Sequence, residues 1–297
     1  MKQELPKHQD LIHPYRVIEG NTFHMRNVDP SDTQGLQLKH QASDLLSVDV
    51  RRISALQQLL HPQNRWSLLL IFEGMDASGK DSAIRHTMSG VNPAGCRTHS
   101  FETPSEEELS HDFLWRASLH LPRKGHIGIF NRSYYEEVLV PRVHPDLLGQ
   151  ERIPETLQTG KIWQERYESI RNYERHLTRN GTAICKFLLH VSKEEQKRRF
   201  LKRLDRPDKR WKFSKDDVQD REHWDDYRKA LEEAVRNTSA PDAPWYVVPG
   251  DHKWFARLVM TAAIITTLES LDLAVPRLKR EKKKEIDEAR DFLGHDQ

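Results

Sequence analysis

The sequence predicts an α/β fold in which helices cover both faces of a mainly parallel sheet. Two observations support this fold class. Short apolar runs alternate with segments of helical periodicity, and a glycine-rich loop follows the run at Trp66–Phe72. Alternating strands and helices favour parallel pairing, because each helix returns the chain to the same edge of the sheet. Strands that are buried on both faces appear as continuous apolar runs, as these do.

The individual elements follow from length and spacing. We expect five strands, at Trp66–Phe72, Arg97–Phe101, His126–Phe130, Ala183–Val191 and Trp245–Val248. The Arg97–Phe101 run is the weakest of them. Apolar residues at helical spacing separate the strands. We expect helices at about 46–60, Asp81–Met88, Ser105–Leu119, Lys161–Arg179, Lys193–Leu204, Asp216–Val235 and Trp254–Leu271.

The chain is organised as one domain with extensions, because we find no internal repeat and no low-complexity linker in its 297 residues. Residues 1–60 are expected to form an N-terminal extension, whose polar first part wraps the surface, and a helix that packs on the core. Residues 61–275 form the main domain. Residues 276–297 form a charged tail, either solvated or in contact with another subunit.

Composition excludes several classes of protein. Lys and Arg total 47 and Asp and Glu 45, so the net charge is only +2 and any basic site has to be local. The longest uncharged apolar stretch, Leu258–Leu268, is too short to span a membrane. Cys96 and Cys185 have no metal-ligand spacing and are expected to be reduced thiols. The N-terminus lacks an apolar signal segment, so we expect a cytoplasmic protein without a membrane partner.

The glycine-rich loop matches the pattern G-x-x-x-x-G-K, with Gly74, Gly79 and Lys80 at the fixed positions. The glycines let successive backbone N–H groups converge on phosphate oxygens, and the next helix adds its positive N-terminal end. Lys80 adds a mobile positive charge. A strand before the loop and a helix after it favour a phosphate-binding P-loop. Its predicted binding residues are Gly74, Ala77, Ser78, Gly79, Lys80, Asp81 and Ser82.

Two acidic residues distinguish this loop. Asp81 stands where the usual nucleotide-binding loop has the Ser or Thr that binds Mg²⁺, and Ser82 comes one place later. A carboxylate there could hold a metal directly or through water. Asp76 lies inside the loop, where it would repel phosphates unless a cation lay between. We therefore predict a metal-associated role for Asp76; the alternative is an acid that bonds the loop N–H groups.

Polar residues also follow the strand at His126–Phe130. Asn131 and Arg132 come first, then the acids Glu136 and Glu137. In P-loop kinases the strand beside the loop strand delivers a carboxylate to the metal at this point. Ligands of open parallel sheets bind at the carboxyl ends of strands, so we expect Arg132 to contact the transferred phosphoryl group. The alternative is a surface arginine paired with Glu136.

A dense run of Lys and Arg follows the fourth predicted strand, between residues 193 and 215. Arg199, Arg203 and Arg206 recur at helical spacing and are expected to share one cationic face. P-loop kinases place a closing lid after this strand. One nucleotide does not require so much positive charge, whereas a long polyanion does. A solvated helix face remains the alternative.

Together these segments resemble the polyphosphate kinase 2 family, a branch of the P-loop kinases. The resemblance extends in order from about Tyr15 to Leu271. It rests on FEGMDASGKDS, HTMSGVNPAGCR, PSEEELSHDFLWR, GHIGIFNRSYYEEVLVPRVH, LLHVSKEEQKRRFLKRLDRPDKRWKF and APWYVVPGDHKW. The Asn131-Arg132-Ser133 version is most similar to the class that phosphorylates both AMP and ADP. Glu137 departs from the Asp of similar members and has the longer carboxylate side chain.

The resemblance implies a three-layer P-loop kinase-like fold with a helical lid at about 192–215. It implies an enzyme that moves the terminal phosphoryl of inorganic polyphosphate to AMP or ADP, reversibly and with Mg²⁺. The implied partners are polyphosphate and adenine nucleotides in a homo-oligomer, without nucleic acid. Asp76 and Glu137 would associate with the metal, and Lys80 and Arg132 would hold the reacting phosphates. Asn131, Arg199 and Arg203 would complete the phosphate- and nucleotide-binding residues.

Two alternatives remain open from the sequence. An ATP-dependent nucleotide kinase of the thymidylate-kinase type also carries a similar loop, although Asp81 and the basic lid count against it. A non-catalytic module that binds nucleic acid could use the same basic segment. It would lack a recognisable reading motif, and Trp211 and Phe213 are too few aromatics for a stacking platform.

Overall fold

The computed structural model describes residues 6–37, 39–212 and 220–294. Six strands in these residues form one sheet in the order β1-β6-β5-β2-β4-β3. They are β1 (Arg16–Val17), β2 (Ser67–Glu73), β3 (Cys96–Ser100), β4 (Ile127–Asn131), β5 (Thr182–His190) and β6 (Trp245–Pro249). Neighbouring strands pair in parallel, except that β1 is antiparallel to β6. The predicted mainly parallel sheet is confirmed.

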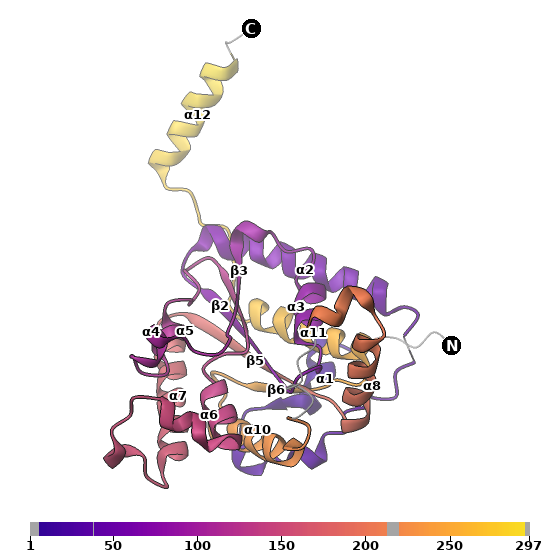
Figure 1. Cartoon of the computed structure of the whole chain (residues 1–297). Helices are drawn as coiled ribbons and strands as arrows, with labels where there is room; N and C mark the ends of the chain where they lie inside the picture. Colours follow the sequence, from indigo (N-terminus) through magenta and orange to yellow (C-terminus); the bar gives the residue numbers. More distant parts are fainter. Residues whose placement is uncertain (1–5, 38, 213–219, 295–297) are drawn as a thin grey trace.

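Helices cover both faces of the sheet (Figure 1). Along β2, Leu68 and Leu70 face one apolar core, and Leu69 and Ile71 face the other. The first core is closed by α1 (His8–Ile12), α2 (Ala42–Gln63), α3 (Lys80–Thr87) and α11 (Lys253–Glu269). The second is closed by α6 (Glu136–Val143), α7 (Ile162–Arg179) and α10 (Trp224–Thr238). This is the predicted three-layer α/β fold.

Helix α2 shows how the apolar pattern sets the packing. Val50, Ile53, Leu56 and Leu60 recur every three or four residues and are all buried. This stripe packs on α11, which is buried along most of its length. Asn64 ends α2 in the left-handed conformation, with φ of 49°. Because α11 is packed on both the sheet and α2, its first turn is held firmly beside the glycine-rich loop.

The sequence suggested that the N-terminal segment only wraps the surface. In the structure this segment also contributes buried residues to the core. Leu11 and Tyr15 are 0% and 3% exposed and belong to the first core. The Tyr15 hydroxyl donates to Asp32 at 2.6 Å, and its ring packs edge-on against Phe255. Strand β1 extends the sheet beside β6. The segment looked polar because only one residue in several is buried.

Two predicted helices are wrong in extent. Ser105–Leu119 is not continuous but divides into α4 (Glu106–Leu109) and α5 (Trp115–Ser118). The Asp112 carboxylate accepts a hydrogen bond from the N–H of Leu114 at 3.0 Å, an alternative to helical bonding that short acids favour. The predicted helix at Asp216–Val235 begins only at Trp224, after a turn at 220–223; residues 216–219 lie outside the described residues.

The lid and the tail complete the chain. Helix α8 (Lys193–Leu204) has the predicted bounds, and the last predicted lid residues, 213–215, lie outside the described residues. Helix α12 (Arg280–Gly294) has no buried residue and projects clear of the body (Figure 1). Within the described part of the chain, no helix has the length and apolarity needed to cross a membrane.

Candidate active site

The glycine-rich loop joins β2 to α3 and turns sharply at residues with positive φ. Gly74, Ala77 and Gly79 have φ of 142°, 58° and 101°. A Cβ atom on Gly74 would lie 2.9 Å from the carbonyl oxygen of Leu189 and 3.0 Å from Ser78 Oγ. Only glycine fits there without displacing the backbone of β5. The loop therefore has the curvature that the sequence pattern predicted.

Lys80 is the first residue of α3, and its buried ammonium turns back onto the loop. It donates to the carbonyl oxygen of Gly74 and, at 3.4 Å, to that of Met75. Asp81 points elsewhere, because its carboxylate accepts from the side-chain amide of Asn131 at 2.9 Å. The structure thus brings Lys80 to the loop and Asp81 to the end of β4.

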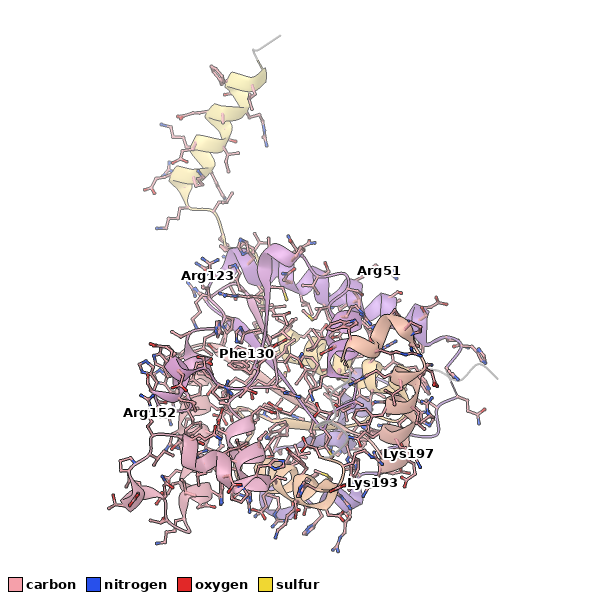
Figure 2. The ribbon with its side chains drawn as sticks, viewed as in Figure 1. Arg51, Arg123, Phe130, Arg152, Lys193 and Lys197 are labelled. Atoms are coloured by element: carbon pink, nitrogen blue, oxygen red, sulfur yellow. The ribbon has the colours of Figure 1, made fainter. Side chains whose placement is uncertain are left out.

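Strand β4 ends just beyond Phe130, which is labelled in Figure 2. The next residue, Asn131, also donates to Ser100 Oγ at 3.3 Å. Arg132 then adopts φ of 61°, which is uncommon for a residue with a side chain, and its N–H donates to the carbonyl oxygen of Phe72 at 3.0 Å. Strained backbone of this kind persists where the surroundings fix it, often at functional sites.

An ion pair joins Arg132, which follows β4, to Asp76 in the glycine-rich loop. The guanidinium donates to the Asp76 carboxylate at 2.7 Å and lies 3.9 Å from that of Glu136. Burial opposes the charge of Arg132, but the carboxylates of Glu136 and Asp76 outweigh it and raise the pKa of Arg132. These three residues line a cavity of about 210 Å³, together with Tyr227 and Arg221. The cavity therefore holds fixed charges of both signs.

Glu137 lies apart from Asp76. Its buried carboxylate accepts from Arg116 at 2.6 Å, and its carbonyl oxygen accepts from Arg166 at 2.6 Å. Burial raises the pKa of Glu137, while Arg116 opposes that shift. Glu137 lines a second cavity, of about 170 Å³, whose wall also includes Arg132 and Glu136. Arg132 and Glu136 thus separate the two cavities.

Glu73 is a residue of the site that sequence reasoning missed. It ends β2, is fully buried, and its Oε1 accepts from the Ser133 hydroxyl at 2.7 Å. Burial, helped by the nearby carboxylate of Glu136, raises the pKa of Glu73 well above its ordinary value. Glu73 therefore fixes Ser133 and so the segment that carries Arg132.

The lid helix α8 packs directly on the loop. Gln196 donates to the carbonyl oxygen of Asp76 at 2.8 Å. Arg199 is buried; it donates to the carbonyl oxygens of Ser78 and Gly250, both at 2.5 Å, and to Glu195 at 2.7 Å. Arg203 lies over the Phe200 ring, 5.3 Å from its centroid. The three arginines do not form one open cationic face, because Arg199 points inward.

The donor chemistry around Asp76 fits Mg²⁺. Asp76 and Glu136 line the same cavity, and each has a carboxylate. Mg²⁺ prefers oxygen ligands and needs only one or two protein carboxylates when phosphates complete its shell. The residues described here contain no cluster of three or more His, Cys, Asp or Glu that could hold a metal alone. The Glu137 carboxylate is already engaged by Arg116.

Sequence reasoning found some of this geometry and missed the rest. It identified the loop and the residues at the end of β4. It missed Glu73, Arg116 and Gln196. Glu73 and Arg116 adjoin apolar residues, whereas Gln196 lies within a run of charged residues. Nothing local showed which partner each of the three would meet.

Comparison with known proteins gives concordant results. A family model described as polyphosphate kinase 2 matches residues 37–275. An ADP-polyphosphate phosphotransferase of Rhodopseudomonas palustris is 49% identical over 280 residues, which is 94% of this chain and 97% of that protein. An AMP/ADP-polyphosphate phosphotransferase of Meiothermus ruber is 42% identical over 271 residues, 91% and 97% of the two chains. The crystal structure of polyphosphate kinase 2 from Arthrobacter aurescens superposes with a TM-score of 0.84 at 35% identity, covering 95% of this chain and 96% of that one.

Proposed function

The chain belongs to the polyphosphate kinase 2 family, and on that premise we propose that it transfers the terminal phosphoryl group of polyphosphate to AMP and ADP, reversibly. It is an enzyme, a polyphosphate–nucleotide phosphotransferase. The choice of acceptors is supported by the similar protein named for both AMP and ADP. The observation that carries the proposal is the pairing of Arg132 with Asp76 beside the phosphate-binding loop.

The reaction needs charge and alignment rather than a general base. A nucleotide phosphate loses its second proton near pH 6, so the attacking oxygen is already ionised near neutrality. Negative charge then spreads over the oxygens of the transferred group. We assign its stabilisation to the loop N–H groups, to Lys80 and to the guanidinium fork of Arg132, which can contact two oxygens at once. Lys80 would exchange its loop carbonyl partners for phosphate oxygens.

We propose that Asp76 holds Mg²⁺, which neutralises phosphate charge when it is bound. Asp76 lies in the loop and shares its cavity with Glu136. Glu137 was the second metal residue suggested by resemblance. Both carboxylates are paired with an arginine, but that of Glu137 is buried against Arg116, whereas that of Asp76 is 27% exposed and can reach a ligand. Asp76 also orients Arg132 through their ion pair. Replacement of Asp76 would therefore disturb both the binding of Mg²⁺ and the position of Arg132.

The acceptor nucleotide is assigned to the second cavity, on the Glu137 side of Arg132. Its wall is largely apolar, with Phe101, Leu109 and Pro141 among its residues, as suits a nucleoside. Arg132 lies at the boundary between the cavities and so can meet phosphates from both. The terminal unit of polyphosphate would then lie in the cavity of Asp76.

Donor choice separates this function from that of an ATP-dependent nucleotide kinase. The enzyme is incubated with Mg²⁺, polyphosphate and either AMP or ADP, without ATP, and the products are separated by chromatography. We expect ADP and ATP to form. Transfer that requires ATP would contradict the proposal, and absence of transfer together with RNA binding would favour the nucleic-acid module. A cytoplasmic location and a homo-oligomer remain predictions.

A further inference from the structure

Two buried tyrosines, Tyr134 and Tyr135, connect the segment of Arg132 and Ser133 to helix α6. Both side chains are 0% exposed and belong to the second apolar core. Neither lines the cavity of about 210 Å³ or the cavity of about 170 Å³. Any effect of the two tyrosines on the reaction therefore passes through the residues beside them in the chain.

The hydroxyl groups of both tyrosines converge on one buried carboxylate, that of Glu174 on α7. Tyr134 donates to Oε1 of Glu174 at 3.0 Å, and Tyr135 donates to the same oxygen at 2.8 Å. The other oxygen, Oε2, accepts from the ammonium of Lys186 on β5 at 2.6 Å. Lys186 also donates to the Tyr135 hydroxyl at 3.0 Å and to the carbonyl oxygen of Thr238 on α10 at 2.9 Å. We call these five residues the Glu174 network.

Stability alone does not explain the Glu174 network. Glu174 and Lys186 are both 0% exposed, and burial lowers the pKa of Lys186 to about 8, although Glu174 opposes this shift. A buried ion pair adds little stability compared with apolar residues of the same volume, because both charges lose their hydration. What the pair provides here is an acceptor at a fixed position for two hydroxyl groups. Satisfied buried networks of this kind make one arrangement of their members rigid.

Arg132 is the residue of the site that needs such a restraint. Its φ of 61° is uncommon for a residue with a side chain, and a conformation of this kind persists only where its surroundings fix it. On one side, the next residue, Ser133, donates to the carboxylate of Glu73 at the end of β2. On the other side, the Glu174 network attaches the two tyrosines to α7, β5 and α10. The backbone of Arg132 is thus held from both faces of its segment.

We propose that Tyr134 and Tyr135 are positioning residues, which hold the Arg132 guanidinium in place for the transferred phosphoryl group through their bonds to Glu174. This inference rests on the proposed function. A preorganised donor acts where charge develops in the transition state, so a small displacement of the donor slows the reaction more than it weakens the binding of substrates. The tyrosines should therefore affect kcat, and they should do so through Arg132.

The first test removes one hydroxyl group from the network. Tyr135→Phe keeps the ring, and Glu174 keeps its ion pair with Lys186, so the variant should fold. With saturating ADP, polyphosphate and Mg²⁺ we expect kcat to fall about tenfold, while both KM values stay within about twofold of those of the wild type. The matched control, Tyr15→Phe, also removes a buried hydroxyl that donates to a carboxylate, that of Asp32, but it lies in the first core. Its kcat should equal that of the wild type.

The second test asks whether the effect passes through Arg132. In an Arg132→Ala background the guanidinium is absent, so adding Tyr135→Phe should lower kcat no further. Thermal unfolding of every variant gives the folded fraction, to which each kcat is normalised. A network that serves stability alone would change the unfolding temperature and leave the normalised kcat unchanged.

Three results would overturn the inference: an unchanged kcat in Tyr135→Phe, an equal fall in Tyr15→Phe, or a further tenfold fall when Tyr135→Phe is added to Arg132→Ala. Each of them leaves the proposed function intact, because the wild-type enzyme still transfers phosphoryl groups from polyphosphate. A wild-type enzyme that cannot use polyphosphate overturns the function and this inference together.

Discussion

The guanidinium of Arg132 donates to the carboxylate of Asp76 at 2.7 Å and joins the end of β4 to the phosphate-binding loop. The two side chains are 36% and 27% exposed, so both can reach a ligand. Arg132 holds a left-handed backbone conformation at this point. The pair thus fixes a cation and an anion at the place where phosphoryl transfer is proposed.

Replacing Arg132 tests its role in transfer. Arg132→Ala should lower kcat about 10²- to 10³-fold, because one preorganised donor to the transferred group is lost. Unfolding temperature should change little, since the side chain is partly exposed. Arg152→Ala is the control, because Arg152 pairs with Glu106 at the surface and contacts neither cavity of the proposed reaction. Turnover of Arg132→Ala near that of the wild type would refute the assignment.

The metal role of Asp76 predicts a change in Mg²⁺ dependence. Asp76→Asn keeps the shape of the side chain but removes a negative ligand, so more Mg²⁺ should be needed for half-maximal rate. Titration of activity with Mg²⁺ at saturating ADP and polyphosphate measures this. A variant with the wild-type Mg²⁺ requirement would show that Asp76 does not hold the metal.

We expect the replacement of Glu137 to lower the stability of the folded protein. Glu137→Gln leaves the buried Arg116 charge without its acidic partner and should lower the free energy of unfolding by about 3 kcal/mol. Urea denaturation measures the loss. Glu106→Gln, which breaks an exposed pair with Arg152, should cost less than about 1 kcal/mol. Equal stability of the two variants would contradict the buried-pair interpretation.

His190 lies at the end of β5, and we expect it to make the folded protein less stable in acid. Burial, with the charge of Arg228, lowers the pKa of His190 from 6.5 to about 4. Between these values the unfolded chain binds a proton that the folded chain does not, so this contribution is complete above pH 6.5 and disappears as pH falls to 4. It amounts to up to about 3 kcal/mol.

The check is urea denaturation of His190→Asn at pH 7 and at pH 4.5. Its free energy of unfolding should fall less between the two values than that of the wild type. His13→Asn, at an exposed position, should behave like the wild type. If His190→Asn lost as much stability in acid as His13→Asn, the titration of His190 would not contribute.

Local patterns were sufficient to predict the loop. The Gly74, Gly79 and Lys80 spacing describes a backbone shape that depends on few distant residues, and the apolar run before it identifies β2. The end of β4 was found for the same reason. Long-range partners were not predictable in this way. Arg116 and Glu137 are 21 residues apart, and Arg116 lies on α5, which was expected to continue a single helix from Ser105.

The lid shows the limit of periodicity. The helix at Lys193–Leu204 was predicted with its correct bounds, although its apolar residues, Phe200, Leu201 and Leu204, lie only in its second half. Helical spacing could not show which side of the helix meets the loop. Arg199 was expected on an open cationic face, but it is buried against Ser78 and Gly250. A guanidinium can satisfy loop carbonyls as well as phosphates, and sequence alone does not distinguish these partners.

A crystal structure of the enzyme with polyphosphate and a non-reactive ADP analogue tests the central claim most directly. The account predicts a phosphate chain whose terminal unit lies at the loop of residues 74–80 and contacts Arg132, with the nucleotide on the Glu137 side. A chain bound elsewhere on the protein, with the loop free of phosphate, would contradict it.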